Sequence, residues 1–178
     1  METKIFTARS MAFIALMAAL ICVCAPFVIP LGAVPLSLAT FAVYLSGALL
    51  GAKRGMLAVL IYLLLGAVGV PVFAGFTAGL GQLLGLTGGF LIGYIPCALL
   101  TGIFAERTNK LWGCAVGMAL GTVSCYAVGS VWYMAFSGAD IISALMGCVA
   151  PFIPGDCIKI AAACAVVMPM RKRIEFNK

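Results

Sequence analysis

The chain contains no histidine, and charged residues occupy only 9% of its 178 positions. Hydrophobic residues make up 65% of the sequence, and the mean hydropathy is +1.22. A water-soluble domain of this size could not tolerate so much apolar sequence at its surface, so the composition indicates an integral membrane protein. The long charge-free stretches exceed the roughly ten-residue alternating segments of a membrane β-barrel. We therefore expect an all-α membrane protein.

The missing residue types also argue against catalysis. Without histidine and without a Cys-x-x-Cys pair, a zinc or haem site lacks its usual ligands, so we expect no metal and no cofactor. A serine hydrolase would want a basic partner such as histidine. An aspartyl enzyme would need two carboxylates at membrane depth, where only Asp156 lies. No glycine-rich phosphate-binding loop ending in Gly-Lys is present, so any ATP must be used by a partner.

Basic residues divide the chain into three long apolar intervals, residues 10–52, 55–105 and 111–170. Lys and Arg collect on the cytoplasmic side of membrane proteins, so an interval that begins and ends beside them crosses the membrane an even number of times. Two crossings in each interval give six transmembrane helices, with the N and C termini and the basic loops in the cytoplasm. The expected spans are residues 8–29, 36–51, 55–70, 90–105, 112–136 and 156–168, within a single domain over residues 1–178.

This orientation also accounts for the net charge of +6. The Lys and Arg residues are dispersed at loop positions, with no stripe of interleaved basic and aromatic residues, so we expect no nucleic-acid partner. The basic start and the apolar run after it could also be a signal peptide, but further spans of equal hydrophobicity favour a first helix that is retained. That helix should end at the break from Pro30 to Pro35.

Residues 71–89 are rich in glycine yet carry no charge, which is typical neither of a solvated linker nor of a strong helix. Non-helical backbone persists at membrane depth only where protein buries it or where it lines a cavity. We interpret this segment as an outer loop between the third and fourth helices, folded back over the bundle. In the fifth span, small residues at four-residue spacing favour close helix packing within the chain: Gly113, Gly117, Gly121, Cys125 and Gly129.

Asp156 and Lys159 are the two charges that neither a loop nor a terminus accounts for. They lie one helical turn apart at the start of the last span, so their side chains share a face. Asp156 could be a helix N-cap or a first-turn residue. The two residues could also form a structural ion pair, although desolvation often cancels the gain from such a pair. Ionisable residues at membrane depth are by default a sign of function, and we favour the polar corner of a ligand cavity near the outer surface.

A cavity closed by the glycine-rich loop would suit a small amphipathic molecule. Its wall would contain Phe73 and Phe76, and its floor would carry Asp156 and Lys159. Asp156 would accept hydrogen bonds from N–H donors of the ligand, and Lys159 would meet an acceptor or a carboxylate. The two phenylalanines could instead serve packing or face lipid.

Four motifs in order carry a resemblance to a known family: Gly69 to Phe76, Gly79-Leu80-Gly81, Gly85 to Gly93 and Pro151 to Lys159. They resemble the BioY family, the biotin-binding membrane subunits (S components) of energy-coupling factor (ECF) transporters, over nearly the whole chain. Leu86 departs from the pattern, since the family commonly has a proline before Thr-Gly-Gly. The resemblance implies six membrane helices and a high-affinity site that captures biotin from outside a bacterial or archaeal cell.

The resemblance also implies partners in the cell membrane. A transmembrane coupling protein and two cytoplasmic ATPase subunits would complete an importer that releases biotin inside. In this family the first helix carries an AxxxA surface that meets the coupling protein, and Ala15 and Ala19 match that pattern. Small residues at this spacing are also ordinary in membrane helix packing.

The site residues implied by the chemistry and the resemblance together are Phe73, Gly75, Phe76, Gly81, Thr87, Gly88, Gly89, Asp156 and Lys159. By its chemistry, Asp156 should accept the ureido N–H groups of biotin. Lys159 could bind the ureido oxygen, bind the carboxylate or hold Asp156 ionised, and the sequence does not choose among these roles.

Two other functions stay open at this point. A self-sufficient carrier or channel for biotin or a similar vitamin could use Asp156 as a proton-coupling carboxylate, and its uptake would collapse with the proton gradient. A structural membrane scaffold would bind no ligand at all.

Overall fold

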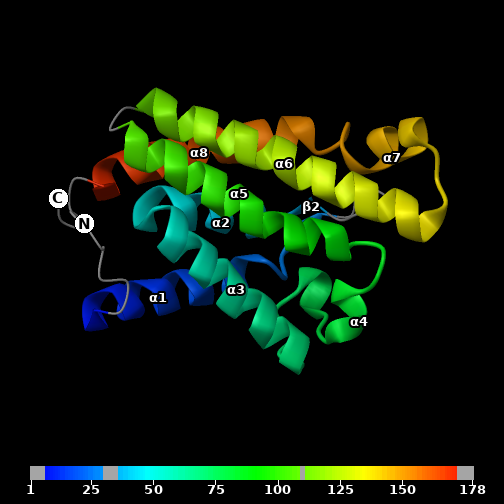
Figure 1. Cartoon of the computed structure of the whole chain (residues 1–178), viewed down its shortest axis with the longest axis horizontal. Coiled ribbons are helices and arrows are strands. Elements are labelled where there is room, and N and C mark those ends of the chain that lie inside the picture. The colour runs from blue at the N-terminus through cyan, green and yellow to red at the C-terminus, as the bar shows by residue number, and fades with distance from the viewer. Residues whose placement is uncertain (1–6, 30–35, 109–110, 172–178) are drawn as a thin grey trace.

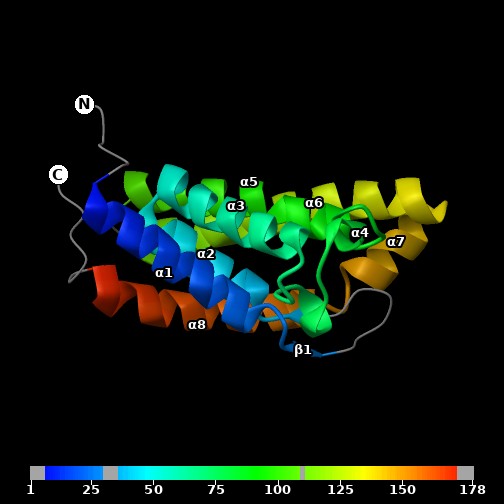
Figure 2. The same ribbon diagram turned by 90° about the horizontal axis from the view of Figure 1, so that it is seen from below.

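The computed structural model describes residues 7–29, 36–108 and 111–171, and most of these residues are helical. Within them, six helices of 12 to 27 residues run roughly along the long axis of the molecule (Figures 1 and 2). They are α1 (Ala8–Cys24), α2 (Ala39–Leu50), α3 (Ala52–Val68), α5 (Gly88–Arg107), α6 (Leu111–Ser137) and α8 (Ile153–Arg171). The shorter elements are β1 (Val28–Ile29), β2 (Leu36–Ser37), the 3-10 helix η1 (Ala74–Phe76), α4 (Leu80–Leu83) and α7 (Ile141–Cys148). By length and composition, α5, α6 and α8 could each cross a membrane.

The short helix α2 occupies the centre of the bundle. Ten of its 12 residues are buried, and it packs against α1, α3, α5 and α8. A helix that is apolar all round belongs in such a position, because protein covers every face of it. Gly47 permits the close approach of α5, since a Cβ atom added there would lie 2.6 Å from the carbonyl oxygen of Ala98.

Polar contacts tie the helices together where α2 meets α3. Gly51 joins the two helices with a φ of +86°, a conformation that residues with a Cβ atom rarely adopt. The Ala52 N–H then donates to Glu106 Oε1 at 3.0 Å, so a carboxylate from the last turn of α5 satisfies a free N–H group at the start of α3. At the same end, the Arg171 guanidinium of α8 donates to the carbonyl oxygen of Ala105 at 2.5 Å.

The described basic residues other than Lys159 all lie at this end of the bundle, on the left in Figure 2. They stand at the first turns of α1 and α3 and at the last residues of α5 and α8: Arg9, Lys53, Arg54, Arg107 and Arg171. The opposite end carries the β1–β2 hairpin, η1, α4 and α7. Among the residues described, all basic side chains except Lys159 therefore gather at one end of the bundle.

The first two helices differ from the predicted spans at their outer ends. α1 ends at Cys24 rather than at residue 29, because β1 turns away to pair antiparallel with β2, with Val28 opposite Ser37. The same pairing delays the start of α2 to Ala39. The proline break predicted at residues 30–35 lies outside the described residues.

The last helix is longer than predicted at both ends, running from Ile153 to Arg171. Pro154 falls in the first turn, where backbone N–H groups have no intrahelical acceptor, so its lack of an N–H group removes no helix hydrogen bond. Pro169 falls in the last turn, so little helix follows it. Neither proline therefore bounds the helix.

The glycine-rich segment contains η1 and α4 and folds back against the end of the bundle opposite the basic residues (Figure 2). Phe73 anchors it: this side chain is 1% exposed and packs edge-on against Tyr62, with ring centroids 5.6 Å apart. Its ring lies directly over Gly66, where a Cβ atom would overlap the ring. The Gly75 N–H donates to the carbonyl oxygen of Pro26 at 3.1 Å, which links the segment to the stretch before β1.

Candidate functional site

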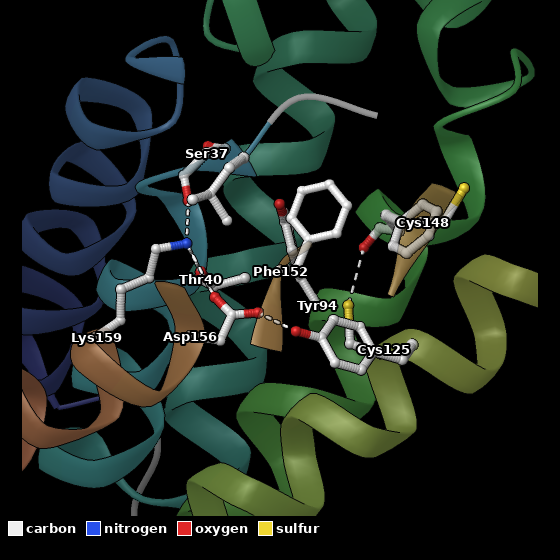
Figure 3. Close-up of a pocket in the computed structure, with 11 residues that line it drawn as sticks. Ser37, Thr40, Tyr94, Cys125, Cys148, Phe152, Asp156 and Lys159 are labelled. Atoms are coloured by element: carbon white, nitrogen blue, oxygen red, sulfur yellow. Dashed lines mark hydrogen bonds and ion pairs between the residues drawn. The ribbon is translucent and has the colours of Figure 1, made fainter. Parts of the chain in front are cut away.

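Asp156 and Lys159 lie buried side by side in the first two turns of α8 and face α2 (Figure 3). The Lys159 Nζ and Asp156 Oδ1 atoms are 2.9 Å apart. Asp156 is a first-turn residue and not the N-cap, because the helix begins at Ile153 and the Asp156 N–H already donates to the carbonyl oxygen of Phe152.

The Lys159 ammonium group uses all three of its N–H donors within the protein. Besides Asp156, it donates to the main-chain carbonyl oxygen of Ser37 at 2.6 Å and to Thr40 Oγ1 at 2.9 Å. An ammonium group has three donors and no acceptor, so this cation is fully satisfied. A buried cation without such partners would lower the stability of the fold by several kcal/mol.

The Asp156 carboxylate has different partners on its two oxygens. Oδ1 accepts from Lys159 and, at 3.3 Å, from the Thr40 hydroxyl, which closes a three-residue ring of hydrogen bonds. Oδ2 accepts from the Tyr126 hydroxyl of α6 at 2.5 Å. Oδ2 therefore depends on a neutral hydroxyl alone among the residues described, and it is the oxygen most easily taken over by another donor.

The start of α2 is positioned by Ser37, the last residue of β2. Its hydroxyl donates to the carbonyl oxygen of Ala25 and accepts from the Ala39 N–H, both at 2.9 Å. This arrangement occupies the Ser37 side chain with the backbone and leaves the Ser37 carbonyl oxygen for Lys159. The turn into α2 and the start of α8 are thus joined by one ammonium group.

A small cavity of about 40 Å³ lies against this cluster, walled by aromatic and small side chains (Figure 3). The residues lining it include Ser37, Thr40, Phe90, Tyr94, Tyr126, Phe152, Asp156 and Lys159. A second cavity of about 40 Å³ shares Ser37, Phe90 and Tyr94 with the first and extends toward the glycine-rich segment, where it meets Phe73, Thr77, Gln82 and Thr87. Sites for small molecules usually enclose at least about 300 Å³, so neither cavity by itself has the volume of such a site.

The structure divides the predicted glycine-rich-segment residues into those near the cavities and those away from them. Phe73 and Thr87 line the second cavity. Phe76 is 63% exposed and contacts Phe27, with ring centroids 6.1 Å apart. Gly75 and Gly81 do not line either cavity, and a Cβ atom at each would have open space around it.

Gly88 and Gly89 begin α5 and are buried by helix packing. A Cβ atom at Gly89 would overlap the side chain of Trp132 on α6, and one at Gly88 would overlap the carbonyl oxygen of Leu83. Neither glycine lines the two cavities. On α1, Ala15 and Ala19 are both exposed, at a face that could meet another protein.

Sequence reasoning missed Ser37, Thr40, Tyr94 and Tyr126. Ser37 and Thr40 are neutral polar residues in a long apolar stretch, and polar residues at membrane depth tend to face the interior of a bundle. That signal was available, but it does not say which polar residues meet. Among the described residues, no group of three or more His, Cys, Asp or Glu side chains is placed to hold a metal ion.

The fold and this cluster define a class of protein: a helical membrane protein with a charged pair buried between its helices beside a small aromatic cavity. The comparisons with known proteins name the family. The chain belongs to the BioY family, whose model matches residues 1–176. The resemblance seen in the motifs is therefore confirmed.

Relatives come from bacteria and archaea. The chain is 44% identical over 156 residues to the biotin transporter BioY of Thermotoga maritima, covering 86% of this chain and 90% of that protein. It is 41% identical over 167 residues to the biotin transporter BioY of Rhodobacter capsulatus, covering 85% and 87%. It is 37% identical over 156 residues to the probable biotin transporter BioY of Pyrococcus horikoshii, covering 88% and 92%.

A crystal structure of the S-component for biotin from an ECF-type ABC transporter has a similar fold. The TM-score is 0.83 at 28% sequence identity, over 92% of this chain and 91% of that one. These relatives are named as transporters and not as enzymes. The expectation of a multi-pass membrane protein that does no chemistry of its own is confirmed.

Proposed function

We propose that the protein is the biotin-binding S component of an ATP-driven ECF importer in the bacterial or archaeal cell membrane. It captures biotin from outside and releases it inside, together with a transmembrane coupling protein and two cytoplasmic ATPase subunits. The observation that carries this proposal is the buried Asp156–Lys159 pair, joined to Thr40 and Tyr126, in a member of the BioY family. A buried ion pair adds little to stability, so its place beside a cavity points to a ligand.

The proposed topology has six membrane helices, α1, α2, α3, α5, α6 and α8, with both termini in the cytoplasm. The gathering of Arg9, Lys53, Arg54, Arg107 and Arg171 at one end of the bundle supports this orientation, since basic residues collect on the cytoplasmic side. The glycine-rich outer loop between α3 and α5 and the ligand site then lie toward the outside. The 12-residue helix α2 is short for a membrane span, but this is compatible with the proposed topology because neighbouring helices cover it.

The chemistry of the cluster fits the ureido ring of biotin, which has two N–H donors and one carbonyl acceptor. One ureido N–H donates to Asp156 Oδ2 and replaces the Tyr126 hydroxyl there. Lys159 can donate to the ureido oxygen only by giving up one of its three partners, and Thr40 is the exchangeable one because it can still donate to Asp156. Phe90, Tyr94 and Phe152 then provide the apolar wall for the sulfur-containing ring and the side chain of biotin.

Biotin titration of the purified protein tests this proposal. Asp156→Asn removes the charge that strengthens hydrogen bonds to the ligand, each worth about 1.5–3 kcal/mol, so we expect affinity to fall at least about tenfold. Lys159→Ala should weaken binding to a similar or larger extent. Asp140→Asn, which changes an exposed carboxylate at the start of α7, is the matched control and should keep its affinity.

Thermal unfolding of each variant must accompany the titration. Lys159→Ala leaves a buried carboxylate without its cation, which costs about 3–5 kcal/mol in other proteins, so its binding is interpreted only where the variant is folded. Asp156→Asn keeps the side-chain shape and is the more informative variant. Unchanged affinity in both variants would remove the site hypothesis.

Uptake measurements separate the importer from a self-sufficient carrier. Biotin uptake should require the coupling protein and the ATPase subunits and should survive dissipation of the proton gradient while ATP is maintained. Uptake by the protein alone that collapses with the gradient would instead make Asp156 a proton-coupling carboxylate.

A further inference from the structure

A second, larger hollow lies on the other side of the Tyr126–Asp156 hydrogen bond. It is a groove of about 610 Å³ between α6 and α8, closed at the outer end by residues of α7 and the turn after it. Its wall is almost wholly apolar, and several of its side chains are largely exposed, including Val123 at 62% and Val131 at 63%. In a protein that spans the membrane, such a surface faces the hydrocarbon of the bilayer.

The groove runs lengthwise along α6. Ala119, Val123, Ala127 and Val131 line it at four-residue intervals along α6, which gives a track of roughly 18 Å at 1.5 Å per residue. An extended acyl chain can lie along this track between α6 and α8, and we call this part of the groove the slot.

One polar group in this wall lacks a partner. The Ser130 side chain is buried, at 7% exposure, and its hydroxyl has no hydrogen-bond partner among the described residues. The other hydroxyls of the wall are satisfied, since Thr122 donates to the carbonyl oxygen of Met118 and Tyr126 donates to Asp156. A buried hydroxyl without an acceptor lowers stability by about 1–3 kcal/mol. We therefore expect the occupant of the groove to supply an acceptor for the Ser130 hydroxyl.

The depth of Ser130 indicates which acceptor this is. The 27 residues of α6 extend about 40 Å, so in the proposed topology an upright, centred α6 reaches about 5 Å beyond each boundary of a hydrocarbon core about 30 Å thick. Ser130 lies seven residues before the end of α6, or roughly 10 Å along the axis. It is therefore about one helical turn inside the outer boundary, close to where the ester groups of outer-leaflet lipids meet their acyl chains.

We propose that the α6–α8 groove binds one phospholipid of the outer leaflet. One acyl chain lies in the slot along Ala119, Val123 and Ala127, and its ester carbonyl accepts a hydrogen bond from Ser130. This acyl chain covers the Tyr126–Asp156 hydrogen bond on the side that faces the bilayer. The site is separate from the small cavity proposed for biotin, which lies on the α2 side of the same hydrogen bond.

The test measures lipid binding to delipidated protein by native mass spectrometry, using dioleoyl phosphatidylglycerol as the probe. Wild-type protein should bind one lipid more tightly than all others. Ala127→Phe fills the slot and should abolish this tight binding, whereas Ala161→Phe, at an exposed position of α8 outside the groove, should retain it. Equal lipid binding by the two variants would overturn the proposal.

The hydrogen bond is tested separately, because Ala127→Phe reports only on the slot. Ser130→Ala should weaken the tight binding about two- to tenfold, and Ser124→Ala, on the same helix outside the groove, should not change it. The diether analogue of the same lipid has no ester carbonyl, so it should bind wild type as weakly as it binds Ser130→Ala. An ester lipid and its diether analogue that bind wild type equally would refute the assigned hydrogen bond.

Two further outcomes of these experiments would identify a different occupant of the groove. Biotin should leave the affinity for the lipid within about twofold, and Ala127→Phe should still bind biotin. If biotin displaces the lipid and Ala127→Phe no longer binds biotin while remaining folded, the groove belongs to the vitamin site and the proposal is wrong. If delipidated wild-type protein dimerises and Ala127→Phe does not, a second copy of the chain covers the groove and the proposal is equally wrong.

Discussion

The Asp156–Lys159 pair is held by side chains and backbone from β2, α2, α6 and α8. Every ammonium proton of Lys159 has an acceptor, and both carboxylate oxygens of Asp156 have a donor. Such complete pairing offsets the desolvation of the two charges but leaves little net stabilisation. The desolvation of these two charges is explained if one of the partners in the cluster is exchanged for a ligand.

Tyr126 is the partner that we expect to be exchanged. Tyr126→Phe removes the hydrogen bond to Asp156 Oδ2 while keeping the ring, and a bond to a charged group contributes about 1.5–3 kcal/mol. The free protein should therefore unfold at a lower temperature. Because biotin no longer has to displace the hydroxyl, its affinity should be unchanged or higher, and the rise in unfolding temperature on adding biotin should be larger than for wild type.

The control for this prediction is Tyr133→Phe, on the same helix but outside the cavity and the groove. It should change neither the unfolding temperature nor the affinity. A Tyr126→Phe variant with normal stability and weakened biotin binding would show that the hydroxyl contacts the ligand and is not displaced by it.

The close contact between α5 and α6 depends on small residues from both helices. The predicted ridge of Gly113, Gly117, Gly121, Cys125 and Gly129 is buried, and three of its glycines, at positions 117, 121 and 129, face α5. A Cβ atom at Gly121 would lie 2.8 Å from the carbonyl oxygen of Cys97. The prediction that this ridge serves packing within the chain is confirmed.

Gly66 likewise permits a close contact, here with the glycine-rich segment, because the Phe73 ring lies over it. Gly66→Ala should displace this ring from its buried position, at a cost of about 1–3 kcal/mol for overpacking. Since Phe73 lines the second cavity, biotin affinity should fall together with stability. Thermal unfolding and biotin titration measure the two effects.

Gly147→Ala, in α7, is the matched control because a Cβ atom there would meet nothing within 4 Å. The substitution relieves the low helix propensity of glycine, so stability should be unchanged or higher by up to about 1 kcal/mol. If Gly66→Ala behaves like Gly147→Ala, then Phe73 is not held in the way we describe.

The distribution of charge over the whole molecule predicts its orientation in the membrane. An epitope inserted after Gly138, in the turn between α6 and α7, should react with antibody on intact spheroplasts. An epitope inserted after Thr108, at the basic end of the bundle, should react only after the membrane is permeabilised. Reaction of both epitopes on intact spheroplasts would contradict the proposed topology.

The exposed face of α1 is the place where we expect the coupling protein to bind. Ala15→Trp and Ala19→Trp each add a large side chain to this exposed face, which should prevent close helix approach. Biotin uptake in cells should fall at least about tenfold, a loss of about 1.4 kcal/mol or more in coupling, while biotin binding to the isolated protein should be retained. Val116→Trp, at an exposed position of α6, should support normal uptake.

Much of the element pattern could be predicted because it follows from local composition. Apolar length and the placement of Lys and Arg located the helices, and α5 and α6 begin and end within two residues of the predicted spans. The ends of α1 and α2 could not be predicted in this way. They depend on the pairing of Val28 with Ser37, a tertiary contact between segments that read as continuous apolar sequence.

The sequence by itself determined that this is a helical membrane protein of the BioY family and that Asp156 and Lys159 are its unusual charges. Those conclusions depend on hydropathy, charge and motif order, which are properties of the linear chain. Only the tertiary structure decided the partners of the pair, since Ser37 and Thr40 lie more than a hundred positions away and carry no charge to mark them. Helix packing brings them to Lys159, because a buried ammonium group must find an acceptor for each of its protons.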